Sequence, residues 1–496
     1  MTDNRPPSSW ENPRRGNGYG DSRDMSWRSG SNGGTGVFEG RGFMNAGRPY
    51  QQSGYRMQNN QSCSWQRGPT LCRDQGRPVE MRSHNTPGHV HADASGRQPY
   101  STDTRPNSES GGAWRSSRDR GAAPARVLAV YSDVGVENDD NLATSIIGTC
   151  QDMCPVRERE QRQRLRDLAI FERINGNMAR TSATLAVKKF CRTMTVAELQ
   201  PSDIRPQHVL WETLQYLMRM LDRSDYTFDS VHAFLFDRTR AVRQELGMQC
   251  IANSQAITMF EEIVRFHIMS ERELREQKAA TIDDPNSQLN FQQLSKSLLT
   301  LLNLYSAVDA EGRVGWLNEA EFHGYYVLLN LGDRDQFKAE PLSLWFRRLR
   351  PSVLQTQDFM YARRVLSCYR SDNYKGFFDL ARKASYLQGC LMELYFGEMR
   401  GVALKAINFG GYSMHPHPVA DVAKIILMKE GDTEELCKAH GLTTSIDKDH
   451  NMSLISKQSS FNPSTQAFRR QCSLISRKRA PTLFQEIAGE RTDIER

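Results

Sequence analysis

The first 125 residues contain few large aliphatic side chains. They hold six Leu, Ile, Val and Phe residues in total, together with 18 of the 35 glycines and 10 of the 20 prolines. A segment of this composition buries too little apolar surface to offset the entropy that it would lose on ordering. We therefore expect residues 1–135 to form a disordered tail rich in Arg, Gly and Ser, followed by a folded part.

Long apolar runs are also missing. The N-terminus, MTDNRPPSSWENPRR, has no apolar core of a signal peptide, and no window approaches eighteen apolar residues. The ten cysteines are scattered along the chain. These features predict a soluble intracellular protein with reduced thiols and no membrane span.

The common catalytic motifs do not occur. GxxxxGK[ST], HExxH, GxSxG and the kinase motifs are absent, which removes the usual nucleophile, base or nucleotide loop. His415 and His417 alternate with prolines, as exposed loop histidines do. Cys437 and His440 fall at the end of a predicted helix, where a histidine suits the helix dipole. The sequence therefore predicts a protein that is not an enzyme.

Two stretches imitate calcium loops. Residues 309–320 and 447–458 both begin with spaced acidic residues, but each lacks the glycine and the final glutamate that such a loop requires. A hairpin turn explains the Asp and Asn residues of the second stretch without a metal. We therefore predict no calcium site, and no cofactor elsewhere in the chain.

The stretch GTCQDMCPVREREQRQRLR, residues 148–166, raises the question of a metal or redox site. Cys150 and Cys154 are spaced CxxxC, whereas a redox pair is CxxC and a structural zinc site needs two further ligands nearby. Pro155 suits the first turn of a helix, whose free amides Asp152 or the Cys154 backbone could cap. We interpret the stretch as the start of the first helix.

Positive charge is concentrated in the N-terminal tail. Residues 1–125 carry 17 Arg, no Lys and 11 Asp or Glu, a net charge of +6 out of +7 for the whole chain. Arginine interleaved with glycine and aromatic residues is typical of weak, sequence-independent RNA contact. A solvated leader without a partner is the alternative, and the sequence leaves both open.

From Pro155 onward the apolar pattern is helical. Leu210, Leu214, Leu217 and Leu221 fall on one face of a helix, and similar stripes recur to residue 395, separated by short breakers. Helices joined by short loops pack as neighbouring pairs. We predict an all-α helical solenoid of stacked, PCI/TPR-like helical pairs over residues 148–418.

The chain ends in a different pattern. Two short helices followed by two short strands predict a small winged-helix α+β module over residues 419–465. Residues 466–496 form a basic C-terminal tail, in which a nuclear-import signal is a candidate. Its basic residues are Arg469, Arg470, Arg477, Lys478 and Arg479.

Basic clusters in the folded part are candidate nucleic-acid contacts. FDRTRAVRQEL supplies Arg238, Arg240 and Arg243, for which buried structural ion pairs are an equally good explanation. LWFRRLRP, residues 344–351, is by default the solvated edge of a helix.

Several motifs in order resemble the Sac-three/GANP family (suppressor of actin and germinal-centre-associated nuclear protein). The family motif at the helix start comprises Cys150, Asp152, Met153, Cys154 and Pro155. It is followed by AVKKF, RPQHVL, FLFDRTRAVRQEL, EAEFHGYYVLLNLG and PLSLWFR, so that the resemblance covers about residues 148–465. The sequences of these motifs are most similar to those of the short plant members, group C.

The resemblance implies a nuclear scaffold of the second TREX complex, which couples transcription to mRNA export at the nuclear pore. Its helical domain and winged helix would pair with a PCI-domain protein and a small acidic Dss-like protein, and would contact RNA. On the winged helix, Lys424, Lys429, Lys438 and Lys457 are the candidate contacts, chosen from composition. The implied location is the nucleus, with the nuclear envelope or pore as the finer expectation.

Two departures from longer family members bear on partners. Those members continue into a long helix that binds centrin and a Sus-type protein, whereas only about thirty residues, interrupted by Pro481, follow Phe468 here. They also carry Phe-Gly repeats, and the tail of this chain has no Phe-Gly dipeptide. Centrin, the Sus-type protein and direct pore docking are therefore in question for this chain.

Two rival functions use the same architecture. A PCI-like subunit of the proteasome lid or of the translation initiation machinery also combines a solenoid with a winged helix, although GTCQDMCP argues against it. A mitotic or centrosomal role is the second rival. Co-sedimentation with proteasome or ribosome tests the first, and localisation through the cell cycle tests the second.

Overall fold

The computed structural model describes seven stretches of the chain: residues 146–192, 200–277, 285–309, 316–332, 341–446, 451–464 and 471–489. The predicted disordered tail, residues 1–135, lies outside them, and so do Arg469 and Arg470 of the candidate import signal. No helix in these stretches is both long enough and apolar enough to cross a membrane.

The described part is mainly helical. The larger helices are α2 (Val156–Arg164), α3 (Gln207–Arg219), α4 (Phe228–Met248), α5 (Ser254–Gln277), α6 (Pro285–Asp309), α7 (Glu319–Leu329), α8 (Leu342–Arg348), α10 (Gln357–Arg370), α11 (Tyr374–Lys383), α12 (Tyr386–Glu393) and α13 (Phe396–Gly410). Shorter elements are η2 (Ile170–Glu172), η3 (Ile174–Gly176), η5 (Pro201–Asp203), η6 (Met220–Asp222) and α9 (Pro351–Leu354).

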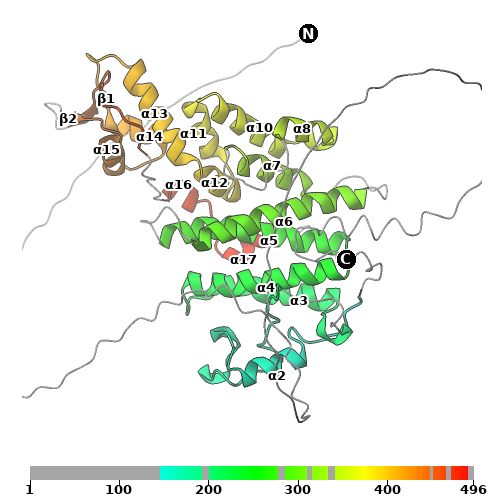
Figure 1. Cartoon of the computed structure of the whole chain (residues 1–496). Helices are drawn as coiled ribbons and strands as arrows, with labels where there is room; N and C mark the ends of the chain where they lie inside the picture. Colours follow the sequence, from blue (N-terminus) through cyan, green and yellow to red (C-terminus); the bar gives the residue numbers. More distant parts are fainter. Residues whose placement is uncertain are drawn as a thin grey trace, which may run out of the picture. The chain divides into compact units, whose positions relative to one another are not determined.

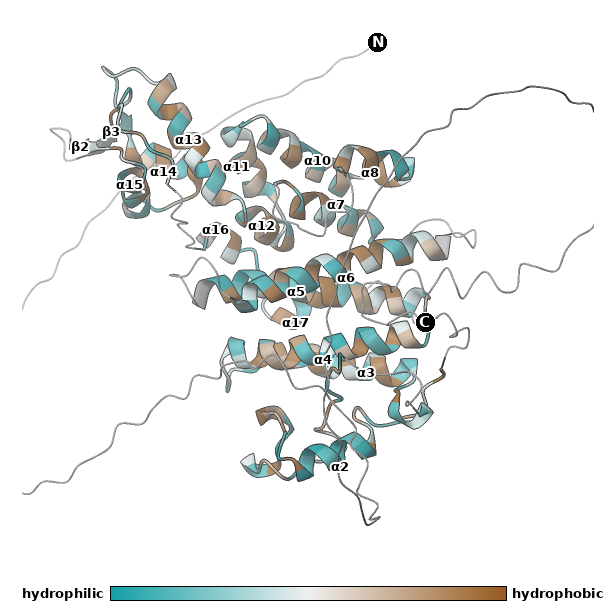
Figure 2. Cartoon of the chain, viewed as in Figure 1, coloured by the Kyte–Doolittle hydropathy of each residue, from teal (hydrophilic) through white to brown (hydrophobic). Residues whose placement is uncertain are grey.

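Successive helices pack against one another (Figure 1). Helix α3 contacts α4, α4 contacts α5, α5 contacts α6 and α6 contacts α7; the stack continues through α10 and α11 to α13. This arrangement confirms the predicted helical solenoid. Figure 2 shows the reason, because the helices are two-sided in hydropathy. The leucine stripe of α3 and η6 is buried as predicted, with Leu210, Leu214 and Leu217 fully inaccessible to solvent.

Side-chain caps set the starts of two later helices of the stack, α10 and α11. The Thr356 hydroxyl accepts a hydrogen bond from the Phe359 amide at the start of α10, and Asn373 Oδ1 accepts one from the Gly376 amide at the start of α11. Each bond satisfies one of the amides that the first turn of a helix leaves without a helical partner. Consequently α10 ends and α11 begins within a few residues, and the two helices lie side by side.

A small α+β module follows α13. It consists of β1 (His417–Pro418), α14 (Val419–Ile426), α15 (Glu430–Ala439), β2 (Thr444–Ile446) and β3 (Met452–Leu454). The strands form an antiparallel sheet in the order β1-β3-β2, with Leu454 of β3 opposite His417 and Thr444. This connectivity is that of a winged helix. The two helices and two strands expected from sequence are present, whereas β1 was not predicted.

Residues 471–489 lie across the solenoid (Figure 1). Helix α16 (Ser473–Ser476) packs on α12, and α17 (Leu483–Ala488) packs on α5 and η6. Ile475 and Ile487 are buried there. The segment was predicted only as part of a basic tail. Its helices were not predicted, because helices of four and six residues are too short to show an apolar period.

Candidate partner and nucleic-acid surfaces

The chain that precedes α2 is fixed to the body by backbone hydrogen bonds. The amides of Thr149 and Cys150 donate to the carbonyls of Pro201 (2.9 Å) and Ile204 (2.9 Å). The Gly148 amide donates to Gln249 Oε1 at 3.0 Å. A Cβ atom at Gly148 would lie 2.6 Å from the Ile204 carbonyl oxygen, so that only glycine allows this approach. The motif therefore joins the first helix to a segment fifty residues later in the chain.

The two cysteines of the motif face inward. Cys154 is fully buried, and burial raises the pKa of its thiol to about 12. Burial likewise raises the pKa of Cys150, whose Sγ donates to the Asp152 carbonyl at 3.2 Å. Neither thiol is therefore a thiolate at neutral pH, the form that binds metals and reacts. Among the described residues there is no group of three or more His, Cys, Asp or Glu side chains arranged to hold a metal ion.

The start of α2 differs in detail from the expectation. Pro155 occupies the position just before the first helical residue, and no described side chain caps the helix. Asp152 instead forms an ion pair with Arg159 at 2.7 Å, while the Met153 carbonyl accepts a bond from Arg205 at 3.2 Å. The motif thus connects α2 to the buried ion pairs described next.

Two buried carboxylates organise the arginines of this region. Glu172 contacts Arg162 and Arg238, with the Arg238 Nη2 atom 3.1 Å away, and accepts the Val187 amide at 2.9 Å. Burial opposes the ionisation of Glu172, but Arg238 and Arg162 outweigh it, and its pKa is lowered. Glu245 is similarly placed between Arg205 (2.9 Å) and Lys188 (3.1 Å), and its pKa is also lowered.

The surroundings of the three arginines of α4 indicate their role. Arg238 is buried with Glu172, and Arg243 is buried with its guanidinium on Ser297 Oγ (2.8 Å) and Gln293 Oε1 (2.5 Å). Arg240 is half-buried, with its guanidinium 3.9 Å from the centre of the Phe190 ring. The structure therefore favours the alternative explanation, in which this cluster stabilises the fold from inside.

The four candidate lysines of the α+β module are exposed. Lys424 pairs with Asp421 at 3.1 Å and Lys438 with Glu434 at 2.5 Å, both on the same helix as their partners. Lys429 lies at the start of α15, and Lys457 Nζ donates to the Phe409 carbonyl. Residues 417–446 and 451–464 contain these four lysines and five acidic residues, a net charge of −1. The module thus exposes cations without being basic.

The candidate import signal is partly engaged with the solenoid. Lys478 Nζ donates to the carbonyls of Ala381 (3.1 Å), Arg382 (2.8 Å) and Ala384 (2.6 Å) at the end of α11. Arg479 lies 3.6 Å from Glu273, while Arg477 is exposed. A cation at the C-terminal end of a helix interacts favourably with the carbonyl dipoles there. In this conformation Lys478 holds the C-terminal segment in place.

The remaining residues singled out from the sequence have structural surroundings. His417 is part of β1, and Cys437 is buried in α15. His440 is buried, stacks on Phe461 at 5.7 Å and accepts the Ser464 amide at 3.1 Å through Nδ1. The two calcium-like stretches fall partly outside the described residues, since 310–315 and 447–450 are not among them.

Sequence reasoning missed a set of exposed apolar side chains. Phe409 at the end of α13, Tyr412 and Met414 before β1, and Ile446 at the end of β2 are all more than half exposed. Helical or strand periodicity gives no signal for them, because they stand at element ends. Strands β1 and β2 are the two edges of the sheet, and sheet edges offer unpaired backbone groups to a partner.

The fold class of the chain is a mainly helical solenoid that ends in a small α+β module. The SAC3/GANP family model matches residues 153–446, more than half of the chain. The chain therefore belongs to the SAC3/GANP family.

Three proteins illustrate this relationship. The chain is 37% identical to SAC3 family protein B of Arabidopsis thaliana over 350 residues, which are 69% of this chain and 20% of that protein. It is 31% identical to SAC3 family protein 1 of Schizosaccharomyces pombe over 378 residues, 71% of this chain and 36% of that protein. It is 31% identical to Protein xmas of Drosophila melanogaster over 268 residues, 52% of this chain and 12% of that protein. The chain thus spans well under half the length of each of these relatives.

Proposed function

We propose that this chain is a non-enzymatic nuclear scaffold in transcription-coupled mRNA export, a subunit of a second TREX complex. The observation that carries the proposal is the SAC3/GANP match over the solenoid and into the α+β module. The site geometry is consistent with it, because the motif residues of the helix start are committed to buried contacts rather than to a reacting group. The proposed partners are a PCI-domain protein, a small acidic Dss-like protein and RNA.

The exposed apolar side chains around the module are the proposed docking face for the PCI-domain protein. Met414 is 85% exposed and Tyr412 is 76% exposed, values that are costly for large apolar side chains without a partner. They lie beside an exposed sheet edge, so that side-chain burial and strand pairing can act together. The winged-helix connectivity of the module suits such a pairing between two similar modules.

The exposed lysines of the module are the proposed RNA contacts of this region. Lys424, Lys429 and Lys457 lie outside α15, which itself carries four acidic residues against Lys438. Contact through these lysines would be electrostatic, falling with salt and independent of base sequence. The negative balance of the module keeps this contribution small.

Affinity purification of the tagged chain from nuclei tests the scaffold and its docking face together. A variant with Tyr412→Ser, Met414→Ser and Ile446→Ser should lose a PCI-domain subunit that the wild type recovers. The matched control, Leu165→Ser with Leu317→Ser, changes exposed apolar residues far from the module in sequence and should retain it. Recovery of no PCI-domain protein by the wild type, or co-sedimentation with proteasome or ribosome, would contradict the proposal.

A further inference from the structure

One short region of the folded part carries a large excess of positive charge. Residues 341–383, which span α8 to α11, contain nine Arg or Lys and three Asp, a net charge of +6. Residues 126–496 together carry only +1, so that the rest of this span nets −5. Seven of the nine cationic side chains are exposed: Arg347, Arg348, Arg363, Arg364, Arg370, Lys375 and Lys383. The region from α8 to α11 is therefore strongly basic at its surface. Residues 157–192 have the same net charge of +6, but part of that charge is paired inside the fold with Glu172 and Glu245.

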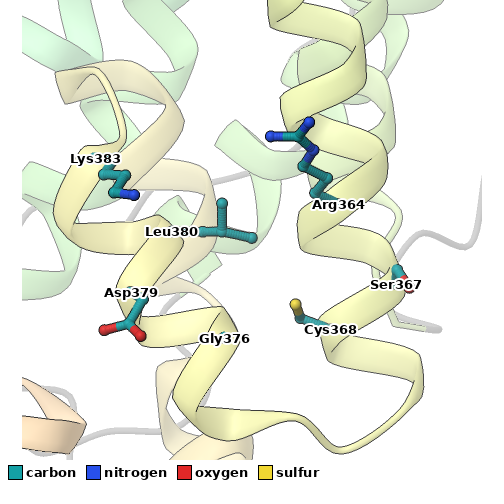
Figure 3. A pocket seen from close by; sticks show the side chains of 7 residues that line it. All are labelled: Arg364, Ser367, Cys368, Gly376, Asp379, Leu380 and Lys383. Carbon is teal, nitrogen blue, oxygen red and sulfur yellow. The ribbon is translucent and has the colours of Figure 1, made fainter.

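A shallow groove lies in this surface between α10 and α11. Its volume is about 350 Å³. Figure 3 shows Arg364 of α10 and Lys383 of α11 reaching toward the gap from opposite sides, with Leu380 between them and Cys368 nearer to Gly376. Asp379 also lines the groove, but its carboxylate is paired with Arg382 at 2.5 Å, which offsets its negative charge.

Packing keeps one end of the groove narrow. A Cβ atom at Gly376 would lie 2.9 Å from Cys368 Sγ and 2.8 Å from Asn373 Nδ2, which shows how closely α10 and α11 approach at that end. The Asn373 side chain is fixed in place because its Oδ1 accepts the Gly376 amide hydrogen bond that caps α11. The Arg364 and Lys383 end is therefore positioned by a rigid helix–helix contact.

The basic surface continues toward α8. The Arg363 guanidinium lies 5.8 Å from the centre of the Phe346 ring, and Phe346 also packs against Phe359 of α10. This contact places the C-terminal end of α8, with Arg347 and Arg348, next to α10. Arginine stacked on an aromatic ring keeps its edge free to bind an anion while its face is covered.

We propose that the surface formed by α8, α10 and α11 binds single-stranded RNA, with Arg364 and Lys383 holding one backbone phosphate across the groove. A row of mostly arginine cations matches a chain of regularly spaced phosphates, and the Leu380 floor can receive the flat face of a base or a ribose. An acidic peptide would use the cations but has no need of the apolar floor. This inference rests on the RNA-binding part of the proposed function and assigns the larger share of it to the solenoid, with the module lysines as minor contacts.

The test is fluorescence anisotropy with a labelled oligouridylate of about 16 nucleotides, titrated with the full chain at several salt concentrations. Arg364→Ala with Lys383→Ala should weaken binding at least about fivefold at about 50 mM salt, and should lower the slope of log affinity against log salt by about 0.7, the value for one phosphate of a single strand. The matched control, Arg164→Ala with Lys405→Ala, removes two exposed cations elsewhere and should change affinity less than about twofold. Unchanged circular dichroism and thermal midpoint establish that both variants are folded.

Three results would overturn the inference, and they are distinguishable. If the wild type binds the oligouridylate and the groove variant binds equally well, the surface assignment is wrong and RNA binding by the chain stands. If the wild type binds no RNA, the RNA part of the proposed function fails as well. A polyglutamate peptide is the third probe. If it competes with RNA for the wild type, and if the groove variant loses as much affinity for the peptide as for RNA, the surface binds acidic proteins.

Discussion

Two regions of the described structure use arginine in opposite ways. In the region from α2 to α4, Arg162, Arg205 and Arg238 are buried against Glu172 and Glu245, which come from different segments. In the region from α8 to α11, most of the cations are exposed, and acids are outnumbered three to one. The difference lies in the partners that the fold brings to each cluster. A local count of charges in the sequence cannot distinguish the two cases.

Removing one buried acid should have the largest effect on stability. Glu172→Gln removes the fully buried countercharge that Arg162 and Arg238 share, leaving only the less buried Glu158 and Asp237 beside them, and should lower the free energy of unfolding by about 3–5 kcal/mol. Asp379→Asn removes the partner of Arg382 on the exposed region and should cost less than about 1 kcal/mol. Urea unfolding followed by circular dichroism measures both. Equal losses would mean that the two regions do not differ as described.

The cysteines of the helix start belong to the buried region, although they carry no charge. Cys150→Ser with Cys154→Ser places two more polar groups in an apolar setting and should lower stability by about 2 kcal/mol. Metal content, measured by elemental analysis of the purified protein, should be the same in variant and wild type. Stoichiometric zinc that disappears in the variant would establish a metal site instead.

Acid should weaken the interior of the solenoid through His267 of α5. This side chain is fully buried, with Nδ1 bonded to Asn290 Oδ1 at 2.8 Å. Burial, with Arg243 as a further cause, lowers its pKa well below the ordinary value. The unfolded chain binds a proton at this histidine as pH falls below about 6.5, and the folded chain does not. The free energy of unfolding therefore falls with pH, by about 1.4 kcal/mol at pH ~5.5 from this group alone.

The measurement is the difference in unfolding free energy between wild type and His267→Asn at pH ~7.5 and pH ~5.5. The difference is needed because burial raises the pKa of Glu261, which therefore responds to acid in the opposite sense. RNA binding by the exposed region should not change over this range, since no histidine is among the described residues that line the groove. An identical pH dependence in wild type and variant would contradict the prediction.

Arg243 should show the smallest effect, because it is buried without a carboxylate. Burial lowers its pKa to about 9, so that it remains charged at neutral pH, and its Nε has no hydrogen-bond partner among the described residues. Arg243→Met should therefore change the unfolding free energy by less than about 1 kcal/mol in either direction. Arg238→Met, which takes one of two cations from Glu172, is the control and should be clearly destabilising. A large loss for Arg243→Met would show that neutral hydrogen bonds suffice to make a buried arginine essential.

Sequence periodicity predicted the helical class of the fold, although it missed β1, α16 and α17. The leucines of α3 and the two helices before the β2–β3 hairpin are where the pattern placed them, because local spacing determines which face of an element is apolar. The ordered motifs likewise identified the SAC3/GANP family. The pairing of Arg238 with Glu172 could not be chosen in advance, because the two residues are 66 positions apart. The groove at Arg364 and Lys383 depends on how α10 meets α11, which no local pattern contains.

The C-terminal segment has a consequence for how this chain reaches its final state during synthesis. The amides of Leu483 and Phe484 donate to the carboxylate of Asp222, 261 and 262 positions earlier, and Cys472 and Ser476 contact Arg272 about 200 positions earlier. Every residue that this segment covers is made before the segment itself. The helices α5 and α12 therefore leave the ribosome with an apolar strip still uncovered, and exposed strips of this kind are what chaperones bind. Synthesis of residues 471–489, rather than folding of the solenoid, closes that strip.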